Sequence, residues 1–223
     1  MADVGFGGHR RTHGFNYDPA KAVSQLRRND PVLGALIRRV GAYGLQSRDH
    51  LTPFQALLRA IVYQQLSGYA AASIDRRLCA LFPHRYPSAE RLLRLSADQL
   101  RGVGLSQAKV RSALDLAQKC RDKTIPGRRA LAQMDDESII VQLTKVRGIG
   151  RWTVEMLLIF HMGRADILPV GDLGIRKGFM LHRGDKELPE PKDLERHGQC
   201  WRPYRSIASW YLWRANDVDW TNI

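Results

Sequence analysis

The stretch that decides the fold runs from residue 143 to residue 174, and its first part reads Leu-Thr-Lys-Val-Arg-Gly-Ile-Gly-Arg-Trp-Thr-Val-Glu-Met (143–156). It predicts a helix, a tight turn at Gly148-Ile149-Gly150, and a second helix that begins at Arg151 or Trp152. Two glycines that flank one apolar residue allow a sharp turn and a close approach of the backbone to a ligand. The turn leaves backbone N–H groups at a helix N-terminus, where they can bind a phosphate oxygen.

Three cations flank this turn, and a carboxylate follows it. Lys145, Arg147 and Arg151 place the turn in positive potential, which favours an anion there. The stretch ends with Pro169-Val170-Gly171-Asp172-Leu173-Gly174, so Asp172 comes directly before a further predicted helix over residues 173–181. An Asp at that position either caps the helix or carries chemistry, and the residues alone favour the cap.

Charge and cysteine usage narrow the class of partner and of site. The 223 residues carry a formal net charge of +13, which favours a polyanionic partner, either nucleic acid or an acidic membrane surface. No apolar run is long enough to span a membrane, and Met1–Asn16 lacks the apolar core of a signal peptide. The three cysteines show no zinc or iron–sulfur spacing. We therefore expect a monomer located in the cytoplasm and associated with the nucleoid.

Helix start signals recur along the chain, and strand signals are almost absent. Asp18-Pro19, Asp30-Pro31 and Thr52-Pro53 each read as an N-cap followed by a first helical residue. Gly184–Pro191 reads as a loop, and Pro203 as the start of a last helix that ends near Ala215. The sequence therefore predicts an all-α protein.

The run Leu143-x-x-Val146-x-Gly148-Ile149-Gly150-x-Trp152-Thr153, followed by Pro169-Val170-Gly171-Asp172-Leu173-Gly174, resembles the helix-hairpin-helix (HhH-GPD) DNA glycosylases. Within them it is most similar to the 3-methyladenine DNA glycosylase II branch of AlkA/Mag type. The resemblance extends from about Leu51 to the C-terminus and implies two helical lobes with the active-site cleft between them. The expected parts are a flexible tail over residues 1–16, a central helical barrel over 50–165 with the helix-hairpin-helix at 143–154, and a discontinuous lobe over 17–49 and 166–223 that carries the catalytic Asp.

The resemblance implies that Asp172 is catalytic. An N-glycosidic bond breaks through an oxocarbenium-like sugar, whose positive charge a fixed carboxylate stabilises while it orients the attacking water. The damaged base must first leave the duplex, and an alkylated, cationic purine calls for aromatic faces in its pocket. The implied pocket residues are Tyr63, Trp152, Met156 and Trp213. Because bacterial AlkA enzymes carry an aromatic residue where this chain has Met156, the base preference stays open.

Further family features map onto two other segments. Tyr63-Gln64-Gln65-Leu66-Ser67-Gly68 resembles the wedge loop, in which Leu66 or Ser67 would fill the gap left by the flipped nucleotide; a plain helix terminus is the alternative. The implied DNA contacts are Lys145, Arg147, Gly148, Gly150, Arg151 and Thr153. The backbone carbonyls of Thr144, Val146 and Ile149 would hold a structural Na⁺ or K⁺, and we expect no required cofactor and no iron–sulfur cluster.

These features predict a monofunctional DNA glycosylase of base excision repair, acting on double-stranded DNA with alkylated bases and releasing 3-methyladenine and 7-methylguanine. One alternative is a bifunctional glycosylase/lyase of endonuclease III type. That class needs a Lys nucleophile where Trp152 stands, and usually four C-terminal cysteines where this chain has only Cys200. The other is a non-catalytic helix-hairpin-helix module, which needs neither Asp172 nor an aromatic pocket.

Overall fold

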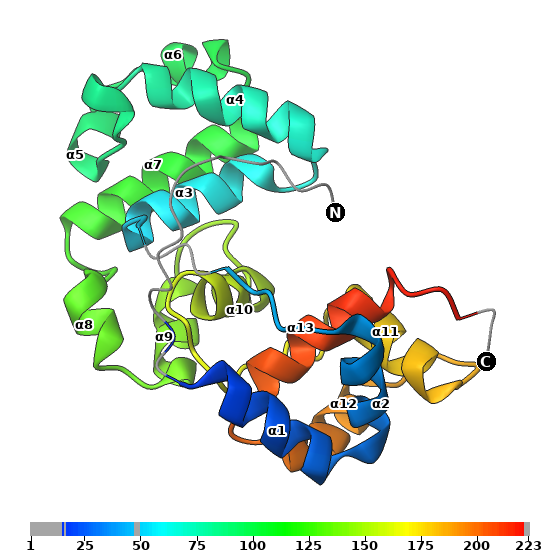
Figure 1. Ribbon diagram of the computed structural model, residues 1–223. Coiled ribbons are helices and arrows are strands. Elements are labelled where there is room, and N and C mark those ends of the chain that lie inside the picture. Colours follow the sequence, from blue (N-terminus) through cyan, green and yellow to red (C-terminus); the bar gives the residue numbers. More distant parts are fainter. Residues whose placement is uncertain (1–14, 16, 47–49, 221–223) are drawn as a thin grey trace. The chain divides into compact units, whose positions relative to one another are not determined.

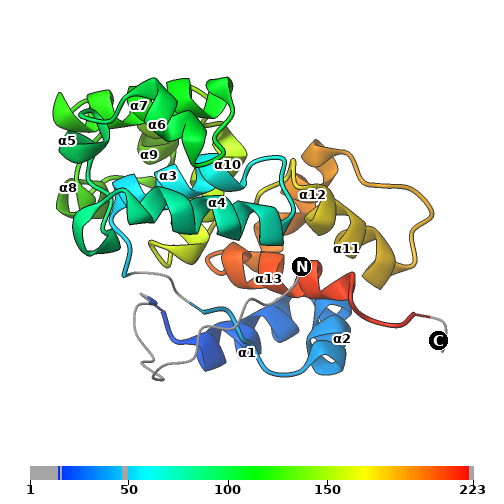
Figure 2. The same cartoon turned by 90° about the horizontal axis from the view of Figure 1, so that it is seen from above.

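The computed structural model describes residues 15, 17–46 and 50–220, which form helices and connecting loops with no strand among them (Figures 1 and 2). The all-α prediction is confirmed. Contacts divide the described residues into one unit of residues 50–157 and another of residues 15–46 and 158–220, so the chain changes unit inside a helix, after Leu157. The sequence places the change of lobe at residue 165, beyond the end of that helix. The predicted tail over residues 1–16 lies, apart from Phe15, outside the described residues.

The first unit is built around the packing of α3 against α7, which Figure 1 shows side by side. α3 buries Leu57, Ile61 and Val62 at helical spacing, and α7 buries Leu116 and Ala117. Its elements are α3 (Pro53–Tyr63), α4 (Gly68–Ala80), η1 (Pro83–Arg85), α5 (Ala89–Leu92), α6 (Ala97–Gly102), α7 (Gln107–Arg121), α8 (Arg128–Ala132), α9 (Asp136–Leu143) and most of α10 (Arg151–Phe160).

The second unit packs α13 against α11, α2 and α1, around the fully buried Trp201 and Tyr211. α11 and α13 cross closely because Gly178 has no side chain; a Cβ there would overlap the carbonyl oxygen of Leu212. Its elements are α1 (Pro19–Asn29), α2 (Pro31–Val40), α11 (Leu173–Arg183), α12 (Pro191–His197), η2 (Gly198–Trp201) and α13 (Arg205–Ala215).

Three predicted helix starts agree with the structure. Asp18, Asp30 and Thr52 accept hydrogen bonds from the first turns of α1, α2 and α3, as predicted. The last helix is a correction, because Tyr204 is still non-helical (φ −120°, ψ 33°) and α13 begins at Arg205 rather than at Pro203. The sequence also missed α12, which buries only Leu194 and so shows no helical period.

Asp30 ties three parts of the second unit together. One carboxylate oxygen accepts the N–H groups of Val32 and Leu33, and the other lies 2.8 Å from both Trp201 Nε1 and His197 Nε2. Burial acts to raise the pKa of Asp30, but the hydrogen bonds from His197, Leu33 and Trp201 outweigh it and hold that pKa well below its ordinary value. The carboxylate is therefore charged and fixed in the core.

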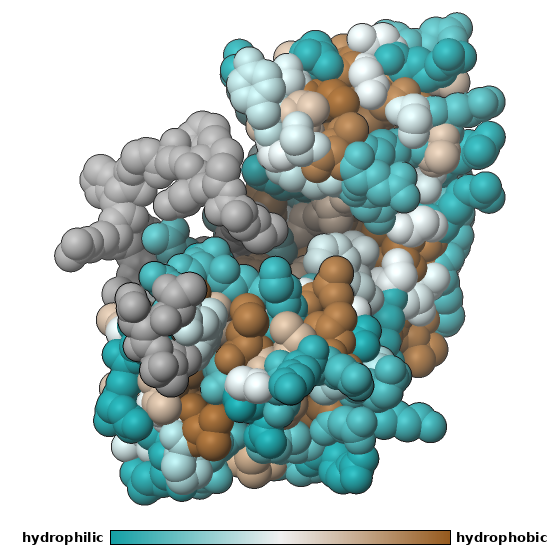
Figure 3. Space-filling view, turned by 90° about the vertical axis from the view of Figure 1, so that its right-hand side faces the viewer, coloured by the Kyte–Doolittle hydropathy of each residue, from teal (hydrophilic) through white to brown (hydrophobic). Residues whose placement is uncertain are grey.

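None of the described helices is both long and apolar enough to cross a membrane. On the face shown in Figure 3, hydrophobic residues are interspersed with hydrophilic ones.

Asp30→Ala should lower the free energy of unfolding by about 3 kcal/mol, because it removes a helix cap and leaves the buried Trp201 N–H without its acceptor. The control Asp18→Ala removes only the exposed cap of α1 and should cost about 1 kcal/mol. The measurement is urea unfolding followed by far-UV circular dichroism. Since the folded-state pKa of Asp30 is depressed, its stabilisation is complete above the unfolded value of about 3.9 and is lost as the pH falls below it. Equal losses for the two variants would contradict this account.

Candidate active site

The predicted turn is present between α9 and α10, and a carboxylate of α7 holds its first residues in place. Gly148 has a φ of +75°, and Ile149 is buried with its N–H 3.1 Å from the carbonyl of Val146. Asp115 on α7 accepts the backbone N–H of Arg147 at 2.7 Å. Burial alone would raise the pKa of Asp115, but the bonds from Arg147 and Lys119 lower it. A charged carboxylate therefore holds the start of the turn against α7.

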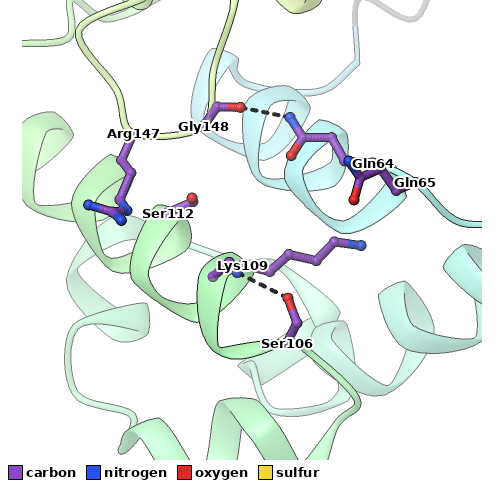
Figure 4. Close-up of a pocket in the computed structure, with 8 residues that line it drawn as sticks. Gln64, Gln65, Ser106, Lys109, Ser112, Arg147 and Gly148 are labelled. Atoms are coloured by element: carbon purple, nitrogen blue, oxygen red, sulfur yellow. Dashed lines mark hydrogen bonds between the residues drawn. The ribbon is translucent and has the colours of Figure 1, made fainter.

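The predicted wedge loop is attached to the same turn. Gln64 follows the last residue of α3, and its amide Nε2 donates to the carbonyl of Gly148 at 2.8 Å, as Figure 4 shows. Gln65 has a left-handed φ of 56°, which a non-glycine residue adopts at a cost. Ser67 caps α4 by accepting the N–H of Ala70, whereas the side chain of Leu66 is exposed. Both predicted wedge residues are exposed, and they differ in that the Ser67 hydroxyl is bonded to its own helix.

A cavity of about 400 Å³ lies beside the turn. Lys109, in the first turn of α7, donates to the carbonyl of Val62 at 2.7 Å, and so serves the C-terminal end of α3. Burial lowers the pKa of Lys109. The residues that line the cavity are Gln64, Gln65, Ser106, Ala108, Lys109, Ser112, Arg147 and Gly148 (Figure 4).

Local partners reduce the positive potential predicted around the turn. Arg151 is bonded to Glu137 through both terminal nitrogens and lies 3.1 Å from the buried Glu155. Lys145 donates to the side-chain oxygen of Gln142 at 2.7 Å. Among the predicted DNA contacts, the charge of Arg151 is thus balanced within the first unit.

In the second unit, Asp172 is both a helix cap and a positioned carboxylate. Its Oδ1 accepts the N–H of Ile175 at 2.9 Å, at the start of α11, and Nε1 of Trp213 at 3.0 Å. Trp213 stacks on Phe160 with ring centroids 5.7 Å apart. Gly174 allows this approach, because a Cβ there would lie 3.1 Å from both Asp172 Oδ1 and Trp213 Cδ1. Two donors from different helices therefore fix the orientation of the carboxylate.

The segment that leads to Asp172 is fastened to α13. Arg205, only 14% exposed in its side chain, pairs with Asp166 at 2.7 Å, and Ser206 Oγ both donates to the carbonyl of Arg164 and accepts the N–H of Ile167. Ser209 donates to the carbonyl of Ile167 at 3.2 Å. The polar residues of α13 thus anchor the chain just before the Pro169–Asp172 turn.

The other predicted pocket residues have mixed surroundings. Trp152 is exposed in the first turn of α10, Met156 is half-buried one turn later, and both belong to the first unit. Tyr63 is partly covered, since the Arg59 guanidinium lies 4.9 Å from its ring centroid and donates to its hydroxyl. Thr153 is buried, which removes its side chain from the predicted DNA contacts and leaves its backbone N–H.

The predicted cation site stays a prediction. The carbonyls of Thr144, Val146 and Ile149 belong to the turn, and that of Val146 already accepts the N–H of Ile149. A carbonyl oxygen has two acceptor directions, so this bond leaves room for a cation.

Several residues of these sites were missed from the sequence. Gln64 and Asp115 act through the main chain of a distant turn, and no local pattern indicates that. Phe160 read as one more apolar residue of a helix. Lys109 did carry a signal, because a cation in the first turn of a helix opposes the helix dipole and needs a reason to be there.

Comparison with known proteins gives the family of this chain. Residues 58–203 match the family model of the HhH-GPD superfamily base excision DNA repair proteins. The chain belongs to this superfamily. It is 35% identical over 201 residues to DNA-3-methyladenine glycosylase 1 of Schizosaccharomyces pombe, covering 89% of this chain and 88% of the relative.

Two solved structures extend the similarity. The S. pombe 3-methyladenine DNA glycosylase in complex with abasic DNA superposes with a TM-score of 0.81 at 31% identity, covering 91% of this chain and 100% of that one. A DNA-3-methyladenine glycosidase from Bacillus halodurans gives a TM-score of 0.80 at 32% identity, covering 92% of each chain.

The two glycines of the turn should respond differently to substitution. Gly148→Ala should lower the free energy of unfolding by about 1–2 kcal/mol, because its φ is left-handed and a Cβ would lie 2.7 Å from Ser112 Oγ. Gly150→Ala should leave stability unchanged, since no atom lies within 4 Å of its Cβ position, but should weaken DNA binding roughly tenfold by blocking a phosphate. Gly127→Ala, with equally open space before α8, is the control for both measurements. Wild-type DNA affinity in Gly150→Ala would remove the turn from the DNA interface.

Proposed function

We propose that this chain is a monofunctional DNA glycosylase of base excision repair, which flips alkylated bases out of double-stranded DNA and hydrolyses their N-glycosidic bond. The observation that carries the proposal is the carboxylate of Asp172, whose Oδ1 is held by Ile175 N–H and Trp213 Nε1–H. The names of the relatives support the same reaction, since four of them are called DNA-3-methyladenine glycosylases.

The chemistry follows from where positive charge develops. As the bond from C1′ to the base nitrogen breaks, its electron pair leaves with the base, and the sugar becomes oxocarbenium-like. A carboxylate already oriented by two donors stabilises this charge without reorganising. It also orients the water, whose oxygen bonds to C1′ and whose proton passes to the carboxylate and from there to solvent.

The leaving base receives no evident proton from the motif around Asp172. Glu155, the one carboxylate of α10, is buried and paired with Arg151 at 3.1 Å. An enzyme without a general acid depends on a base that already leaves well. Alkylation at N3 or N7 puts positive charge on the purine and weakens its glycosidic bond, so 3-methyladenine and 7-methylguanine are the proposed substrates.

The lyase alternative is less well supported, because Trp152 stands where a lyase carries its Lys nucleophile. A purely DNA-binding module would gain nothing from Asp172 being held by a tryptophan of another helix. That bond, at 3.0 Å, favours the glycosylase.

Asp172→Asn should reduce the single-turnover rate of 3-methyladenine release by about 10²- to 10³-fold, because it removes the charge with little change of shape. Trp213→Phe keeps the ring that stacks on Phe160 but removes the N–H donor, and should slow release roughly tenfold, equivalent to about 1.4 kcal/mol. Trp210→Phe, one turn away on α13, should react at the wild-type rate. DNA affinity should change little in all three variants. A fully active Asp172→Asn enzyme would leave Asp172 as a helix cap only.

Base release should follow leaving-group quality. Methylated DNA should lose 3-methyladenine fastest and 7-methylguanine more slowly, and uracil in DNA should be released poorly. The released bases are separated by chromatography, with heat-depurinated DNA as the standard. Parallel reactions quenched with borohydride should contain no covalent protein–DNA adduct. Equal rates for cationic and neutral bases would defeat the leaving-group argument, and a strong adduct would return the lyase alternative.

A further inference from the structure

Tyr69 is an aromatic residue left almost entirely in solvent. Its exposed fraction is 87%, and it is the second residue of α4, directly after the wedge segment. Leu66, three residues earlier, is 40% exposed. A large exposed ring next to a second exposed apolar side chain suits a surface that meets a partner, because aromatic rings supply much contact area at low entropic cost.

The backbone around Tyr69 is held in a defined conformation. Gln64 is bonded to the carbonyl of Gly148, Gln65 occupies the left-handed region, and Ser67 caps the helix that Tyr69 begins. The Ser67 hydroxyl is therefore hydrogen-bonded to α4, while Leu66 and Tyr69 carry the exposed apolar surface of this loop. Leu66, Ser67 and Tyr69 are all exposed, but only Leu66 and Tyr69 offer large apolar side chains there.

The surroundings of the loop suit a nucleic acid. Gln64 and Gln65 line the cavity beside the turn together with Lys109 and Arg147, so cations lie on the same loop-and-turn assembly. Exposed Arg76 and Arg77 lie further along α4. Such a combination, an exposed ring beside cations, is the pattern that binds bases by stacking and the backbone by charge.

We propose that Tyr69 is a DNA-contacting residue that stacks on a base deprived of its neighbour when a nucleotide is flipped out, beside Leu66. The proposal rests on the proposed function, because only an enzyme that flips nucleotides creates such a base within a duplex. The aromatic ring of Tyr69 supplies the stacking face, so the contact does not need the Tyr69 hydroxyl.

The test compares two duplexes of the same sequence, one intact and one with a tetrahydrofuran abasic site. Tyr69→Ala should weaken binding to the abasic duplex about tenfold, the range expected for loss of one stacked base, and binding to the intact duplex by less than about twofold. Tyr69→Phe should bind both like the wild type. Tyr86→Ala is the matched control, since Tyr86 is 54% exposed and follows η1 beyond the other end of α4.

Circular dichroism establishes that each variant is folded, which an exposed residue should permit. Wild-type affinity of Tyr69→Ala for the abasic duplex would overturn the proposal, as would an equal loss on both duplexes, which marks a backbone contact. The wild type is assayed for 3-methyladenine release alongside. If the wild type releases no base but Tyr69→Ala selectively loses affinity for the abasic duplex, the proposed function is wrong and the Tyr69 contact stands. If the wild type releases base and Tyr69→Ala binds the abasic duplex as the wild type does, only the Tyr69 contact is wrong.

Discussion

The close crossing of α11 and α13 at Gly178 is the constraint on which the geometry around Asp172 depends. Any side chain at Gly178 would meet the backbone of Leu212, so the two helices approach only because this position is glycine. Asp172 caps one of these helices and Trp213 lies on the other. The hydrogen bond between Trp213 and Asp172 therefore depends on the packing of the two helix backbones. That packing fixes the position of the carboxylate. A site built on helices in this way keeps its donors in place before a substrate arrives.

In the first unit, polar contacts rather than a close helix crossing hold the glycine turn in place. A glycine turn offers backbone groups to a ligand but has little side-chain packing of its own. Asp115 holds the N–H of Arg147 and Gln64 holds the carbonyl of Gly148, so both sides of the turn are bonded to neighbouring elements. The same Gln64 belongs to the predicted wedge loop, Tyr63–Gly68, so its bond fixes that loop with respect to the turn. Arg151 is balanced by Glu137 and Glu155. Part of the positive charge near the turn is therefore neutralised by ion pairs, and the formal net charge of +13 belongs to the chain as a whole.

Asp172 is a helix cap in the structure and the catalytic carboxylate in the proposed function. The N–H of Ile175 that makes it a cap also fixes the carboxylate, and Trp213 completes the arrangement. The two roles considered from the residues alone, cap and catalyst, are compatible, because the N–H of Ile175 and Nε1–H of Trp213 bind the same oxygen of Asp172. The polar residues of α13 extend this logic, because Arg205 and Ser206 anchor the segment that delivers Asp172.

Local rules determined much of this protein from sequence. Asp–Pro and Ser caps, helical periodicity and the Gly-x-Gly turn are encoded within a few residues, and they were sufficient for the all-α class, most helix starts and the hairpin. The family motif also singled out Asp172 and Trp213. Tertiary structure decided the rest: the last helix begins at Arg205, Ser67 faces its own helix, Thr153 is buried, and Lys109 serves the end of α3. These outcomes depend on partners that lie far away in sequence, and periodicity shows which face of a helix is apolar but not which atom it will meet.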